Sequence, residues 1–134
     1  MPGWIDIRQY MRAARQRLRS GEALRSQDQW LDAIYLAGYA VECALKALLL
    51  SNLPVSRRRR TSFTGRGWHD FERLKFELSR RGVNFPPAVV NALRTVRTWS
   101  TDLRYSAGPG NPSEALDFLE SATIIVHWVE ERLE

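Results

Sequence analysis

The chain has 134 residues, which is the length of one domain with its own hydrophobic core. Its content of 44% hydrophobic and 26% charged residues is typical of a folded globular protein and excludes a disordered one. Two histidines and the single cysteine, Cys43, are too few for a convincing zinc site or a disulfide. Gly65 and Gly67 lack the spacing of a nucleotide phosphate loop, so the sequence predicts neither a metal nor a cofactor.

The net charge of +5 is distributed unevenly along the chain. Residues 1–101 carry 18 basic and 8 acidic side chains, whereas residues 102–134 carry 2 basic and 7 acidic ones. Eighteen of the twenty basic residues are arginine, which contacts phosphate and stacks on bases better than lysine does. This distribution makes a polyanion a candidate partner, although a compositional bias of the genome would have the same effect.

The sequence shows no sign of secretion or membrane insertion. The N-terminal stretch MPGWIDIRQY has no basic segment followed by an apolar run, so no signal peptide is predicted. The longest apolar region is interrupted by Asp32, Glu42 and Lys46, so we do not expect it to span a bilayer. Together with the single cysteine, these features predict a cytoplasmic protein without a membrane partner.

The first predicted helix covers residues 5–25. One of its faces is apolar, and a parallel face is basic, made of Arg8, Arg12, Arg15 and Arg19. The basic face is either simply solvated or a contact for phosphates or an acidic partner. Residues 26–28 break the helix and are predicted to cap the next one.

The second predicted helix, from about residue 29 to 51, is expected to be the centre of a bundle. Its sequence WLDAIYLAGYAVECALKALLL has a wide apolar face in which a ladder of alanines lets another helix approach closely. A polar stripe beside this face consists of Tyr35, Tyr39, Glu42 and Lys46. Glu42 and Lys46 have the spacing of a helical ion pair, which is either structural or part of a ligand site.

In the ligand-site alternative, Tyr39, Glu42 and Lys46 line a polar cleft that faces Arg97, Arg104 and Tyr105. Cations beside aromatic rings would bind the phosphate of a nucleotide and stack its base. His69 is a further candidate for this site, although a histidine at a helix end more often bonds to the backbone. His127 is expected on the solvent face of the last helix.

Residues 52–67 are predicted to form a loop with the run Arg57, Arg58, Arg59 and Arg60 at its tip. Four adjacent arginines repel one another unless an anion binds them. We therefore predict that this run contacts a nucleic-acid backbone, with an acidic protein surface as the alternative.

Three more helices complete the prediction. The third begins at residues 68–70 and ends near Arg81, and the fourth begins at Pro86-Pro87 with Ser100 among its inward positions. The fifth begins after Asn111, ends near Arg132 and is expected to bury Leu116. Because no segment alternates with a period of two, no sheet is predicted.

Three segments occur in order on these elements: AGYAVECALKALLL at 37–50, HDFERL at 69–74 and WSTDLRY at 99–105. This combination resembles the HEPN domain family (higher eukaryote and prokaryote nucleotide-binding) over essentially the whole chain. The resemblance implies an all-α fold, an up-and-down bundle of about five helices, with residues 1–134 forming a single HEPN-like domain. It also implies a two-fold homodimer and a partner such as a nucleotidyltransferase, in a toxin–antitoxin or antiviral defence system.

One branch of this family consists of metal-independent ribonucleases with an arginine followed, after four to six residues, by a histidine. No arginine precedes His69 or His127 at that spacing, and Arg97 is followed there by residues 102–104, which include no histidine. The resemblance is therefore to a branch without this motif, and we expect a non-catalytic protein that binds nucleotide or RNA. The alternatives are a ribonuclease toxin with a degenerate site at Arg97, Arg104 and Tyr105, and a pure protein-interaction module.

Overall fold

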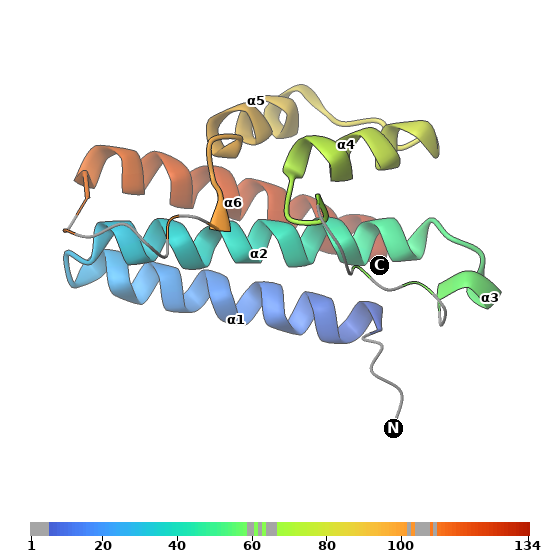
Figure 1. Cartoon of the computed structure of the whole chain (residues 1–134), viewed down its shortest axis with the longest axis horizontal. Helices are drawn as coiled ribbons and strands as arrows, with labels where there is room; N and C mark the ends of the chain where they lie inside the picture. The colour runs from blue at the N-terminus through green and yellow to red at the C-terminus, as the bar shows by residue number, and fades with distance from the viewer. Residues whose placement is uncertain are drawn as a thin grey trace.

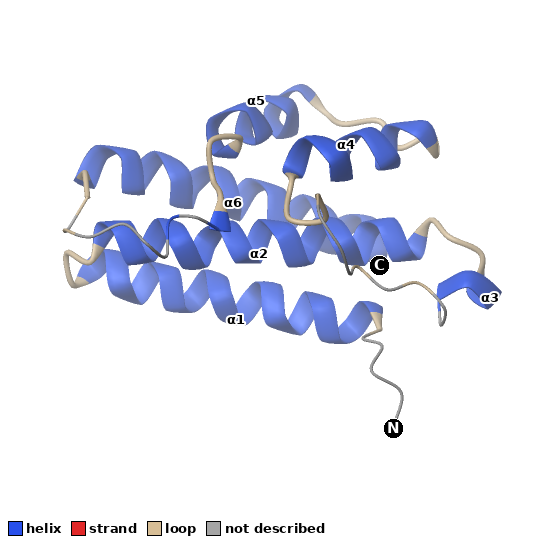
Figure 2. Ribbon diagram, viewed as in Figure 1, coloured by secondary structure: helices blue, strands red, loops and turns tan. Residues whose placement is uncertain are grey.

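The computed structural model describes residues 6–58, 61, 63, 67–101, 103, 108 and 110–134. In chain order its helices are α1 (Ile7–Ser26), α2 (Trp30–Ser51), α3 (Val55–Arg58), α4 (Phe71–Arg80), α5 (Pro87–Val96) and α6 (Pro112–Leu133). No residue within these described ranges forms a β-strand (Figure 2), which confirms the predicted all-α class.

The three long helices form the body of the bundle (Figure 1). α2 packs against both α1 and α6, which also contact each other, and it runs antiparallel to α1 and in the same direction as α6. The shorter α4 packs on α2 and α5 packs on α6, so these two helices cover one side of the body. This arrangement leaves α1 on the opposite edge, where its basic face is exposed.

α2 is the core helix, as its sequence predicts. Its alanine ladder is fully buried and consists of Ala33, Ala37, Ala40, Ala44 and Ala47. Because these side chains are small, α1 approaches the α2 backbone closely, and a Cβ at Gly21 would lie 3.1 Å from the carbonyl oxygen of Ala33. The length and composition of α2 would suit a membrane span, but 72% of its most apolar window is buried inside the bundle, as in the core helix of a globular domain.

The helix boundaries follow capping chemistry. The Asn111 side chain accepts hydrogen bonds from the backbone N–H groups of Ser113 and Glu114, so α6 begins where predicted. The Asp70 side chain accepts from the N–H of Glu72, which starts α4 at Phe71 rather than at residues 68–70.

Four expectations about local structure are wrong. Residues 26–28 do not cap α2: Asp28 adopts a left-handed turn with a φ of 61°, and the N-cap Gln29 makes no side-chain capping bond. The short helix α3 lies inside the predicted loop, starting just after Pro54. Ser100 is exposed because α5 ends at Val96, and Leu116 is 43% exposed because it lies in a groove between α1 and α6.

Candidate functional site

Glu42 is the centre of a buried polar network on α2. Its Oε2 accepts a hydrogen bond from Lys46 Nζ at 2.8 Å, and its Oε1 lies 2.8 Å from His69 Nδ1. Glu42 and Lys46 are buried, whereas the His69 side chain is 52% exposed. The spacing of Glu42 and Lys46 predicted their pairing, and His69, a further candidate for the same site, lies against Glu42. The histidine ties the segment before α4 to the middle of α2.

The surroundings of this network are apolar. Burial, followed by the nearby Cys43 and Glu42, raises the pKa of Tyr10 to about 12. Burial also raises the pKa of the Cys43 thiol to about 11, with the Glu42 charge as the next cause. The ammonium group of Lys46 lies 5.3 Å from the centroid of the Phe63 ring. The Lys46 side chain is therefore buried in an ion pair with Glu42, and it does not present its charge to a ligand in solvent.

Tyr39 belongs to an aromatic cluster around Trp99. Its ring meets the Trp99 ring edge to face at 5.0 Å between centroids, and its hydroxyl oxygen lies 3.3 Å from that of Tyr35. The other side of Trp99 stacks on Phe71, with centroids 5.2 Å apart and planes 6° apart. Trp99 also donates a hydrogen bond from Nε1 to the carbonyl oxygen of Tyr35, at 3.2 Å. Tyr39 thus packs within a structural cluster that joins α2 to α4.

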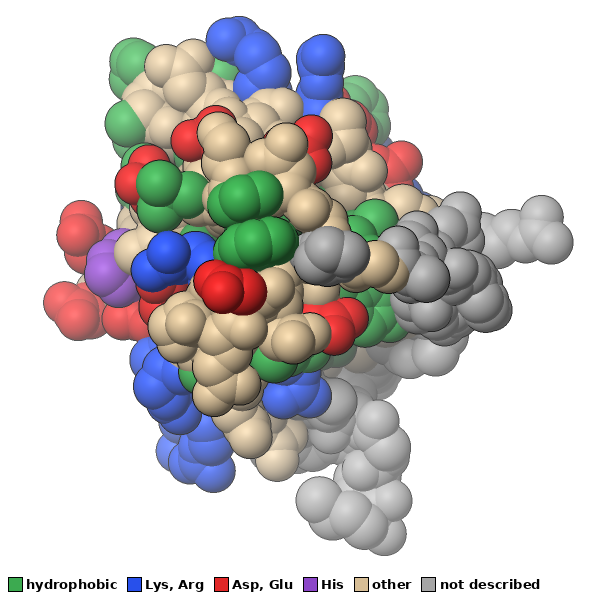
Figure 3. All heavy atoms as spheres, turned by 90° about the vertical axis from the view of Figure 1, so that its left-hand side faces the viewer, with side chains coloured by type: hydrophobic (Ala, Val, Ile, Leu, Met, Phe, Trp, Pro, Cys, Tyr) green, Lys and Arg blue, Asp and Glu red, His purple; other side chains and the backbone are tan. Residues whose placement is uncertain are grey.

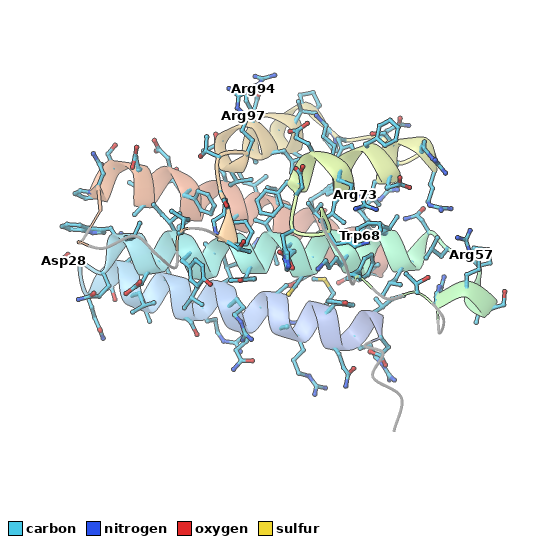
Figure 4. The ribbon with its side chains drawn as sticks, viewed as in Figure 1. Asp28, Arg57, Trp68, Arg73, Arg94 and Arg97 are labelled. Carbon is cyan, nitrogen blue, oxygen red and sulfur yellow. The ribbon has the colours of Figure 1, made fainter. Side chains whose placement is uncertain are left out.

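The predicted arginine partners of this cleft do not join it among the described residues. Arg97 is exposed at the end of α5, and no hydrogen bond or ion pair links it to the Glu42 network. In Figure 4, Arg97 and its neighbour Arg94 point away from α2 into solvent. Arg104 and Tyr105 lie outside the described residues.

The Arg57–Arg60 run is only partly described, because Arg59 and Arg60 lie outside the described residues. Arg57 is exposed, as predicted. Arg58 instead donates hydrogen bonds from Nε to the carbonyl of Leu53 and from Nη2 to that of Ser51, at 3.1 and 2.9 Å. Arg58 therefore satisfies backbone groups just beyond the end of α2 and is not an exposed phosphate contact.

A basic pocket of about 290 Å³ lies between the end of α2, α3 and α4, and sequence reasoning did not predict it. Its charged side chains are Arg57, Arg73, Glu77, Arg80 and Arg81. Phe63 and Trp68 supply aromatic walls, and Leu49 and Leu53 supply an apolar one. Figure 4 shows Arg73 beside Trp68, with Arg57 further out on α3. We call this site the arginine pocket.

Arg73 is held against the Trp68 ring, with its guanidinium carbon 3.8 Å from the ring centroid. Gly67 makes room for this stack: it has a φ of +91°, and a Cβ there would lie 2.7 Å from Arg73 Nη1. The sequence TGRGW contains this glycine, but its role depends on a side chain six residues away. The signal that sequence reasoning missed was the spacing of Arg73, Arg80 and Arg81, which lie seven and eight residues apart and so return to one side of α4.

The surface charges are segregated by helix. In Figure 3, basic side chains gather at the bottom over α1, whereas acidic side chains gather at the left edge over α6. The four arginines of the basic face of α1 are all exposed, and only Arg15 approaches an acidic residue of α6, with 3.5 Å between Arg15 Nη1 and Glu130 Oε1. α1 thus presents a basic face and α6 an acidic edge, while further basic side chains lie at the top of this view.

Comparison with known proteins agrees with this architecture. The chain aligns over 93% of its length, and over 96% of the other chain, with the crystal structure of TT1696 from Thermus thermophilus, at 27% sequence identity and a TM-score of 0.72. No curated protein matches the chain significantly. The family model described as "HEPN domain" matches residues 7–132, which include nearly all of the helical structure. The chain therefore belongs to the HEPN domain family.

Proposed function

We propose that this HEPN protein binds RNA or a nucleotide in the arginine pocket and does not cleave it. The observation that carries the proposal is the convergence of four guanidinium groups and two aromatic rings on one pocket. Guanidinium groups form paired, charge-assisted hydrogen bonds with phosphate oxygens, and aromatic rings offer faces or edges to a base. The pocket thus supplies what the cleft around Glu42 lacks, which is positive charge that faces solvent.

The absence of catalysis is proposed on the chemistry of the two histidines. RNA cleavage without a metal needs a positioned acid and base near neutral pKa, which is usually histidine. His127 is exposed on α6, and His69 lies against Glu42 with no described arginine paired to it at the ribonuclease spacing. The Glu42–His69 contact is the observation that keeps the ribonuclease alternative open, because a carboxylate commonly orients a catalytic imidazole.

We also propose that the protein acts as a homodimer through the groove between α1 and α6. This groove is lined by Leu18, Leu119 and the exposed Leu116 and Ile124, the last two each 43% exposed. Arg19 from α1 and Glu120 from α6 stand on its rims. A two-fold axis along the groove would place each Arg19 against the partner's acidic rim, so a second copy complements the groove in charge.

The biological setting is proposed from family membership. Prokaryotic HEPN proteins often act beside a small nucleotidyltransferase in toxin–antitoxin or antiviral systems, and we propose such a defence-system partner here. The basic face of α1 would suit an acidic partner, because its four arginines are exposed and only Arg8 and Arg15 meet an acidic side chain within the described part of the chain.

Binding of single-stranded RNA as a function of salt tests the proposed function. Each phosphate contact contributes roughly 0.7 to the slope of log affinity against log salt. Changing Arg73 and Arg81 together to Ser should therefore flatten the slope by about 1.4, since two contacts are lost. Arg94→Ser is the matched control, because this arginine is exposed on α5 far from the pocket (Figure 4). An unchanged slope in the pocket variant would remove the RNA site from this pocket.

The same preparations test for cleavage. Without added metal, we expect the RNA to remain intact through a long incubation. Cleavage that disappears in Arg97→Ala or His69→Gln would replace the proposal with the ribonuclease alternative. Cleavage that persists in both variants at the level of the parent would indicate a contaminating nuclease.

A further inference from the structure

Arg81 has an unsatisfied donor in the arginine pocket. Arg81 is the C-cap of α4, and its backbone N–H donates to the carbonyl oxygens of Leu78 and Ser79. Its side-chain Nε is buried and has no hydrogen-bond partner among the described residues. A buried donor on a charged group is costly to leave unpaired, so a turn of the Arg81 side chain that brings this donor to an acceptor oxygen in the pocket would be favoured.

The lining of the pocket also has an excess of positive charge. It contains four arginines and one carboxylate, Glu77, and the contact from Glu77 Oε2 to Arg80 Nε is loose at 4.0 Å. The charged side chains that line the pocket therefore favour a ligand with more than one negative charge. An internal phosphodiester of RNA carries about one negative charge, whereas a terminal phosphate carries about 1.5 to 2 negative charges and three acceptor oxygens.

The small size of the pocket also favours a terminal phosphate. A volume of about 290 Å³ is just below the usual range of small-ligand pockets, which is roughly 300–1,000 Å³. One wall is closed by Leu49 and Leu53, and another by Trp68 with Arg73 packed on its ring. A strand that passes through would need room for nucleotides on both sides of the bound phosphate. A strand end needs room on one side only.

We infer that the arginine pocket receives a terminal phosphate group, on an RNA end or a free nucleotide, in preference to an internal phosphodiester. This inference rests on the proposed function, because it names the part of the ligand that the same pocket recognises. Arg81, once its side chain turns toward the pocket, donates from Nε to a phosphate oxygen, and Arg73, fixed by Trp68 and by the space at Gly67, approaches from the side. Arg57, from the exposed α3, completes the charge balance.

The experiment compares one RNA decamer with a 5′-phosphate, a 3′-phosphate or hydroxyls at both ends, titrated into the full chain and followed by fluorescence anisotropy. We expect at least one phosphorylated form to bind about tenfold more tightly than the hydroxyl form, because extra charge-assisted hydrogen bonds form. AMP and adenosine are then compared as competitors of the bound RNA, which shows whether a free nucleotide is sufficient for binding. If AMP displaces the labelled RNA at concentrations similar to those at which unlabelled phosphorylated RNA does, the site is assigned to nucleotides. If AMP displaces it only at higher concentrations, the site is assigned to RNA ends.

Conservative variants connect the preference to the pocket. Arg81→Lys keeps the charge but removes the Nε donor, and it should reduce the preference to less than about threefold. Arg73→Lys, which loses the planar stack on Trp68, should also reduce the preference. It replaces Arg81→Lys as the test if circular dichroism shows that Arg81→Lys does not fold. Arg94→Lys should leave the preference unchanged.

The outcomes separate this inference from the proposed function. Equal binding of all RNA forms that is weakened by the pocket variants would overturn the inference and leave RNA binding in place. A preference that survives both Arg81→Lys and Arg73→Lys would also overturn it, because the phosphate would then be recognised elsewhere. If neither AMP nor any form of the RNA binds, both the inference and the proposed function are overturned.

Discussion

Trp99 lies directly on Gly38, and its indole ring fills the space that a side chain at position 38 would need. The contact joins α2 to the segment after α5, and the stack of Trp99 on Phe71 extends it to α4. A glycine in the middle of a helix costs about 1 kcal/mol relative to alanine, so this one is retained for the close approach of the indole.

Gly38→Ala should therefore lower the free energy of unfolding by about 1–3 kcal/mol, the usual cost of overpacking, instead of raising it through helix propensity. Chemical denaturation in two backgrounds measures this effect. When Trp99→Ala is already present, adding Gly38→Ala should become neutral or stabilising. An equal loss of stability in both backgrounds would contradict the assigned role of the glycine.

The buried pair of Glu42 and Lys46 leads to a prediction about stability. Glu42→Gln leaves the Lys46 charge buried without its partner, so the free energy of unfolding should fall by about 3–5 kcal/mol. The double variant Glu42→Gln/Lys46→Met removes both charges and should recover most of that loss. Urea denaturation of the parent, both single variants and the double variant gives the coupling energy. If the double variant loses as much free energy of unfolding as the two single variants lose together, the two side chains are not coupled as the structure indicates.

Much of the fold follows from local sequence patterns, whereas the arginine pocket does not. The alanine ladder identified α2 as the core helix, and the four-residue spacing of Glu42 and Lys46 predicted their contact, because both signals repeat within one helix. The contact of His69 with Glu42 joins residues far apart in the chain, as does the seating of Trp99 on Gly38, so no helical period encodes either one. The pocket combines α2, α3 and α4 through a turn at Gly67, and only the folded chain brings their arginines together.

The pKa shifts around Glu42 predict a loss of stability at high pH. Burial raises the pKa of Cys43 from 9.0 to about 11 and that of Tyr10 from 10.0 to about 12. In the unfolded chain both groups release their protons at lower pH than in the folded protein. The contribution of both groups to the free energy of unfolding should therefore be constant below about pH 9 and fall as the pH rises from about 9 towards 12.

Urea denaturation between about pH 7 and pH 11 measures this fall, and Cys43→Ala isolates the part that comes from the thiol. The variant should lose less stability than the parent between about pH 9 and pH 11. Identical pH profiles for the two proteins would show that the thiol is not shielded from solvent in the way that its burial implies.

The proposed dimer leads to a prediction about the groove between α1 and α6. Ile124→Glu places a charge in this apolar groove, so the protein should shift from dimer to monomer at micromolar concentration. Sedimentation velocity measures the shift, with Phe76→Glu on α4 as the control, because this residue is also an exposed large hydrophobic one but lies outside the groove. A parent protein that sediments as a monomer would contradict the proposed dimer.

The central claim, that a phosphate-bearing ligand binds in the arginine pocket, is tested most directly by side-chain NMR. The Nε–H signals of arginine and the indole N–H signals of tryptophan can be followed while single-stranded RNA is titrated into the labelled protein. We predict that Arg73, Arg81 and Trp68 shift first and saturate together, while Arg94 and Arg97 on α5 remain unchanged. Shifts confined to the arginines of α1 or α5, with the signals of the arginine pocket unmoved at saturation, would contradict the claim.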